Sequence, residues 1–126
     1  MSTISRREAR RAAVFILFQS DVTGRPLGSL YEGDVDAYTE RLTHAVSEHA
    51  EALDARITAA ADDWTADRLG AVERNVLRVA LEELDEREVP TEVVLDEAVS
   101  LAKRYASEDA ARLVNGILGR VVRERG

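Results

Sequence analysis

The apolar residues of this chain recur at a helical spacing almost from end to end. In residues 34–62 they are three to four positions apart over most of the row, at Val35, Tyr38, Leu42, Val46, Leu53 and Ile57. No segment alternates apolar and polar residues as a half-buried strand does, and no internal repeat is present. The spacing therefore predicts an all-α fold, a packed bundle of helices with short connections.

Cap and turn residues divide this pattern into five segments. Ser5 and Glu8 have the spacing of a capping box, and TGRPLG ends the first helix. Pro90 closes the third segment, and Ser107 can cap the last. We expect helices over residues 5–21, 34–62, 65–86, 91–106 and 108–124. The second is long enough to be bent or split, and the third has an apolar arc wide enough for a central helix.

Length and composition limit the class of protein. A chain of 126 residues with 45% apolar and 33% charged residues predicts one globular domain, residues 1–126. The chain has no cysteine, which excludes disulfides and thiolate metal sites. No apolar run approaches the ~20 residues of a membrane span, and no signal peptide is evident. We therefore expect a soluble, cytoplasmic protein.

Charge is distributed unevenly along the chain. The whole protein has a net charge of -7, yet its first 26 residues contain five arginines against Glu8 and Asp21. A helical wheel places Ala9, Ala12, Ala13 and Ile16 on one face, assigned to the core. It places Arg7, Arg11, Val14 and Phe18 on the opposite face, which we expect to face water. Guanidinium groups bind phosphates, and an aromatic ring can stack on an unpaired base, so this stripe favours single-stranded RNA. Two alternatives stay open, solvated arginines and burial of Phe18 by a neighbouring helix or a second subunit.

Two further features concern acidic residues and catalysis. Glu73 lies inside the apolar arc of the third segment, so we expect it to meet an arginine, accept backbone hydrogen bonds or lie at a partner interface. Glu82 and Glu83 are expected on a solvated acidic face.

His44 and His49 are five residues apart, which does not align two metal ligands on a helix, and no phosphate loop or nucleophile elbow is present. The sequence predicts no enzyme, no cofactor and no metal.

Three stretches carry a resemblance to a known family. They are RREARRAAVFILFQ, VERNVLRVALEEL and VPTEVVLDEAVSLAKRYASEDAARLVNGILGRV, in that order. On these residues the chain resembles the NusB transcription antitermination factors of bacteria over nearly its whole length. The resemblance implies two stacked helical bundles that share the N-terminal helix.

The same resemblance implies a non-enzymatic function. NusB-like proteins pair with NusE, a ribosomal protein, and the pair binds the box A element of nascent RNA. The complex helps RNA polymerase read through terminators, notably in ribosomal RNA operons. The resemblance assigns RNA binding to Arg6, Arg7, Arg10, Arg11 and Phe18, and the NusE interface to Glu73 and Glu82. The competing hypothesis is a self-associating helical module that buries the arginine and phenylalanine face in a homodimer.

Several positions depart from the family pattern. Relatives commonly have Tyr at the position of Phe18, Tyr at that of Glu82 and Asn at that of Asp96, and often an aromatic and a basic residue at those of Thr91 and Glu92. These changes add negative charge, so we do not expect the affinity for RNA or NusE to carry over at full strength. The fold also occurs fused to ribosomal RNA methyltransferases, but with the C-terminus at Gly126 we expect a free-standing factor.

Overall fold

A computed structural model of the chain describes residues 4–62 and 65–125, and it is helical throughout with no strand in those ranges. Five α-helices and two short 3-10 turns follow one another as α1 (Arg6–Thr23), η1 (Leu27–Ser29), α2 (Ala37–Ala60), η2 (Ala66–Arg68), α3 (Ala71–Glu86), α4 (Thr91–Tyr105) and α5 (Glu108–Arg125). The all-α prediction is confirmed. In the described part, no helix is long and apolar enough to cross a bilayer.

The helix ends are set by the capping residues. Ser5 accepts a hydrogen bond from the Glu8 amide at the start of α1, and Ser107 accepts one from the Ala110 amide at the start of α5. The Ser5 hydroxyl also donates to the Glu8 carboxylate, so the two side chains pair directly. Gly24 ends α1 in the left-handed conformation, with φ of 74°.

Two predicted segments differ in detail from the structure. α2 is one unbroken helix from Ala37 to Ala60, so of the two expected alternatives the split is not observed. The third segment begins with η2 instead of α-helix, and α3 starts only at Ala71, after Gly70. The predicted boundary was early because Ala66 and Leu69 are buried and extend the apolar pattern beyond the helix.

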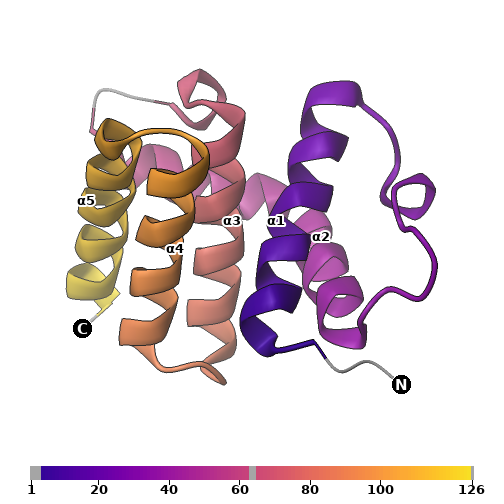
Figure 1. The fold of residues 1–126 in the computed structure, drawn as a ribbon. Helices are drawn as coiled ribbons and strands as arrows, with labels where there is room; N and C mark the ends of the chain where they lie inside the picture. The colour runs from indigo at the N-terminus through magenta and orange to yellow at the C-terminus, as the bar shows by residue number, and fades with distance from the viewer. Residues whose placement is uncertain (1–3, 63–64, 126) are drawn as a thin grey trace.

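α3 is the central helix, as expected. It contacts α1, α2, α4 and α5, and Figure 1 shows it between the α1–α2 pair and the α4–α5 pair. Its buried positions include Val76, Leu77, Ala80, Leu81 and Leu84. α1 packs on α2 and α3 and also reaches α4 through its side chains, so it belongs to both groups of helices.

Candidate nucleic-acid interface

The buried face of α1 is not the face that the helical wheel selected. Ala9, Arg10, Ala13, Val14 and Leu17 are buried, whereas Ala12 and Ile16 are only half-buried. The prediction that Val14 faces water is therefore wrong. The true buried face lies about midway between the two predicted faces, so the Arg7, Arg11 and Phe18 row forms one shoulder of α1 and the Ala12 and Ile16 row forms the other.

Arg10 explains this rotation, because it is the arginine that enters the core. It is 4% exposed, and its guanidinium pairs with Glu83 of α3 through Nε to Oε1 at 2.5 Å and Nη2 to Oε2 at 3.0 Å. The Tyr38 hydroxyl of α2 also donates to Glu83. Burial alone lowers the pKa of Arg10, but pairing with Glu83 outweighs it and the net shift is upward. Arg10 therefore links α1, α2 and α3, and its Nε and Nη2 donors are both paired inside the fold.

Glu97 of α4 lies between the buried arginine and an exposed one. Its two carboxylate oxygens accept from Arg10 Nη1 at 3.2 Å and from Arg7 Nε at 3.1 Å. The Arg7 side chain is 62% exposed, so most of its guanidinium faces water despite this pair. An exposed pair of this kind contributes ~1 kcal/mol or less, which leaves Arg7 able to exchange Glu97 for a phosphate.

Arg6 and Arg11 have no ion pair among the described residues. The Arg6 guanidinium stacks over the Tyr38 ring, with 4.3 Å between its central carbon and the ring centroid. Arg11 is half-buried, and its Nε is buried without a hydrogen-bond partner in the described structure. A buried guanidinium donor without an acceptor is costly, but because this Nε is shielded from the surface, an outside acceptor can reach Arg11 only through the part of its side chain that stays exposed.

Aromatic residues continue this surface from α1 onto α4. Phe18 is half-buried on the same row as Arg7 and Arg11. One turn away, the Phe15 ring meets the Tyr105 ring edge to face, with centroids 4.7 Å apart, and Arg104 lies over the tyrosine ring at 5.4 Å. Sequence reasoning did not assign Phe15 or Tyr105 to the site. The signal that could have found them is the exposure of a tyrosine at the end of α4, beside Lys103 and Arg104.

The two acidic residues assigned to a partner interface lie in different settings. Glu73, in the first turn of α3, is half-buried and has no ion pair or hydrogen bond in the described structure, so the expected pairing within the fold is not observed. Its carboxylate folds back over Gly70, where a Cβ atom would be only 2.6 Å from Oε2. This places a negative charge at the N-terminus of α3, which has no side-chain cap.

Glu82 and Glu83 do not form a solvated face, and that prediction is wrong. Glu82 is 5% exposed and Glu83 is 1% exposed, because each has a cationic or titratable partner that satisfies a buried carboxylate. The partner of Glu82 is His49 of α2, with 2.8 Å between Nδ1 and Oε1. This hydrogen bond raises the pKa of His49, and the exposed imidazole ring covers Glu82.

Three of the positions that depart from the family pattern, Thr91, Glu92 and Asp96, lie on α4. Thr91, half-buried at its start, accepts a hydrogen bond from Arg125 of α5 at 3.4 Å. Glu92 and Asp96 are both exposed and have no ion pair within the described residues. Both add negative charge to the outer surface of α4.

Comparison with known proteins identifies the family of the chain. The model of the NusB family matches residues 7–123. The chain belongs to the NusB family. It is 43% identical over 122 residues to the transcription antitermination protein NusB of Rubrobacter xylanophilus, covering 91% of this chain and 88% of the relative. It is 39% identical over 127 residues to the NusB of an Exiguobacterium species, covering 96% and 99%.

Solved NusB structures have the same fold. NusB of T. maritima superposes with a TM-score of 0.86 at 34% identity, covering 98% of this chain and 94% of that one. A structure of the antitermination factors NusB and NusE in complex with dsRNA matches with a TM-score of 0.82 at 31% identity, covering 94% and 96%. These relatives confirm the NusB-like fold class and the prediction of a non-enzymatic protein.

Proposed function

We propose that this chain is a transcription antitermination protein that binds box A, a single-stranded element of nascent RNA, in partnership with NusE. Residues 1–126 act as one NusB-like helical domain. The bound complex joins the transcription elongation complex and promotes reading through terminators, notably in ribosomal RNA operons.

The observation that carries the proposal is the unequal use of the arginines on α1. Arg10 takes part in the buried pair with Glu83, whereas Arg11 has no ion pair within the described residues and Arg7 is mostly exposed. A phosphate can accept from the exposed parts of Arg7 and Arg11, and a guanidinium is the side chain best suited to it. The rings of Phe18 and Tyr105 flank the same shoulder and offer stacking surfaces for unpaired bases.

The proposed RNA surface therefore consists of Arg6, Arg7, Arg11 and Phe18, extended by Arg104 and Tyr105. Arg10 is left out as a direct contact because it is buried, and it serves instead to hold α1 in place. Glu73 is the proposed contact for NusE, since its carboxylate has no cation among the described residues. Glu82 is replaced in that role by the exposed ring of His49, which covers it.

The test is a fluorescence-anisotropy titration of labelled box A RNA at several salt concentrations, with and without NusE. Loss of two phosphate contacts in Arg7→Ala/Arg11→Ala lowers the slope of log K against log salt by about 1.4, at ~0.7 per contact on a single strand. Arg56→Ala/Arg123→Ala is the matched control, because it removes the same charge from the α2–α5 side of the molecule. An equal loss of slope in both variants refutes the assignment to α1.

Absence of binding to box A by the folded protein, even with NusE present, overturns the proposal. In that case sedimentation distinguishes the competing hypothesis. If the chain is a homodimer that Arg7→Ala/Arg11→Ala dissociates, the arginine shoulder serves self-association.

A further inference from the structure

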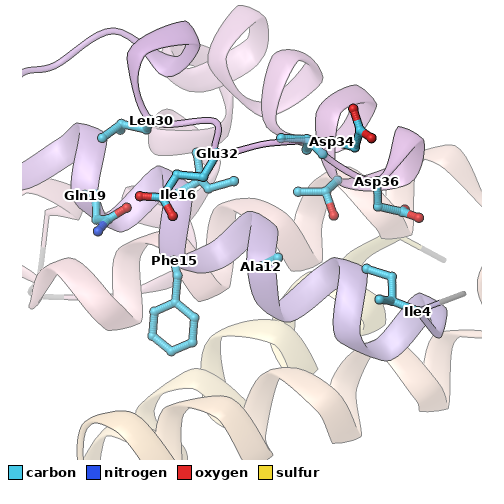
Figure 2. A pocket seen from close by; sticks show the side chains of 11 residues that line it. Ile4, Ala12, Phe15, Ile16, Gln19, Leu30, Glu32, Asp34 and Asp36 are labelled. Carbon is cyan, nitrogen blue, oxygen red and sulfur yellow. The ribbon is translucent and has the colours of Figure 1, made fainter. Parts of the chain in front are cut away.

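The shoulder of α1 opposite the arginines borders an open groove of about 380 Å³. Its α1 side consists of Ala12, Phe15, Ile16 and Gln19, and its other side is the segment of residues 30–36 that leads into α2. Figure 2 shows Ile16 and Gln19 near Leu30 and Glu32, whereas the Phe15 ring points away from the segment that carries Glu32 and Asp34. The volume is at the low end of the ~300–1,000 Å³ typical of ligand sites, enough for a few side chains.

The groove is apolar inside and acidic at its edge. Its apolar lining residues are only partly buried, so each leaves apolar surface in contact with water. They are Ala12, Phe15, Ile16, Leu30 and Val35. Contiguous apolar surface with a polar rim is typical of interaction sites. The lining therefore favours an occupant that contributes at least one apolar side chain.

Three carboxylates, Glu32, Asp34 and Asp36, lie along one side of this groove, and no lysine or arginine lines it within the described residues. Asp36 caps α2 by accepting from the Tyr38 amide at 3.0 Å, which gives it a structural role. Glu32 and Asp34 are exposed and have no ion pair or hydrogen bond in the described residues. These charges repel phosphate and so exclude nucleic acid as the occupant.

We propose that this groove binds a segment of a partner protein in which an apolar side chain is flanked by lysine or arginine. The apolar side chain fills the space between Ile16 and Leu30, and the flanking cations pair with Glu32 and Asp34. The alternative occupant is a second copy of this chain, and sedimentation distinguishes it from a partner protein. The site adjoins the proposed RNA surface at Phe15, which lines the groove and also contacts Tyr105, but Glu32 and Asp34 belong to the groove alone.

The probe is a short synthetic peptide of alternating lysine and leucine, titrated into the labelled protein and followed by amide NMR shifts. Shifts confined to Ala12, Ile16, Gln19 and Leu30 support the groove. Two comparison peptides, one with glutamate in place of lysine and one with serine in place of leucine, are expected to bind more weakly. Equal binding of either comparison peptide, or shifts elsewhere on the surface, overturns the proposal.

Two variants test the two parts of the site separately. Glu32→Lys/Asp34→Lys reverses exposed charges and is expected to weaken binding roughly two- to thirtyfold, from ~0.2–1 kcal/mol for each exposed pair. Ala12→Leu narrows the groove without changing its charge, and this variant is also expected to weaken peptide binding. Glu48→Lys/Glu51→Lys makes the same charge change on exposed positions of α2 and is the matched control.

Circular dichroism checks that each variant keeps its helix content. Equal weakening by the control pair shows a general charge effect and overturns the site. Sedimentation shows whether the groove is covered by a second copy. If the wild-type protein is a dimer and Ala12→Leu dissociates it, the occupant is a second copy of the chain, and the proposal of a partner protein is overturned.

Discussion

The pair between Arg10 and Glu83 makes a strong prediction about stability. Their side chains are 5% and 0% exposed, and two hydrogen bonds join them. Removing one member of such a pair costs ~3–5 kcal/mol, because the other charge is left buried without its partner. In Glu83→Gln the loss is at the lower end, about 3 kcal/mol, because Glu97 still accepts from Arg10 at 3.2 Å.

The double variant distinguishes pairing from packing. Arg10→Met/Glu83→Gln removes both charges, while the amide oxygen that replaces the carboxylate still accepts from the Tyr38 hydroxyl. Replacing both members of a buried pair with neutral side chains of similar volume is often close to neutral, so we expect a loss of about 1 kcal/mol. The double variant is therefore more stable than either single variant.

Urea and thermal unfolding followed by circular dichroism measure these differences. A loss of about 3 kcal/mol lowers Tm by about 10 °C for a chain of this size. Asp62→Asn is the control, since it breaks the exposed pair with Arg120 at 2.5 Å and is expected to cost ~1 kcal/mol or less. The reasoning is refuted if Glu83→Gln costs no more than this control, or if the double variant loses the sum of the two single losses.

Three smaller predictions concern individual residues. The hydrogen bond from Glu82 raises the pKa of His49 above its ordinary 6.5, so its contribution to stability is fully present below that pH and is lost as the pH rises through the raised pKa. An NMR titration of His49 in Glu82→Gln is expected to show a lower pKa than in the wild type, and an unchanged value contradicts the pairing. Gly24→Ala is expected to lower the free energy of unfolding by about 1 kcal/mol, because Gly24 has φ of 74° and open space where a Cβ would lie, so the cost is backbone strain alone. Arg87→Gly is expected to raise it by about 0.5–1 kcal/mol, since Arg87 ends α3 at φ of 59°, and urea unfolding of both variants checks the two signs.

The sequence predicted the helices better than the surfaces. Apolar spacing and caps located all five helices, because burial of a helical stripe and capping by Ser5 or Ser107 are local in sequence. The buried face of α1 was misplaced because the wheel treats every arginine as exposed. Burial of Arg10 requires Glu83, which is 73 residues away, and no local pattern reports that pairing. The same limit applies to Glu82, whose partner His49 lies on another helix.

The arginines of α1 thus have two separate roles, one in the core and one on the surface. The direction in which each side chain leaves the helix axis determines which role it has. Arg10 points toward α3, and its pair with Glu83 sets the rotation of α1 about its own axis. That rotation determines which side chains stand on each shoulder: Arg7, Arg11 and Phe18 on one, and Ala12 and Ile16 above the acidic groove on the other. A variant that keeps every arginine but loses Glu83 therefore alters both proposed sites at once, whereas changes to Arg11 or Glu32 alter only one. Comparing RNA binding and peptide binding in Glu83→Gln tests whether this single buried contact orients both surfaces.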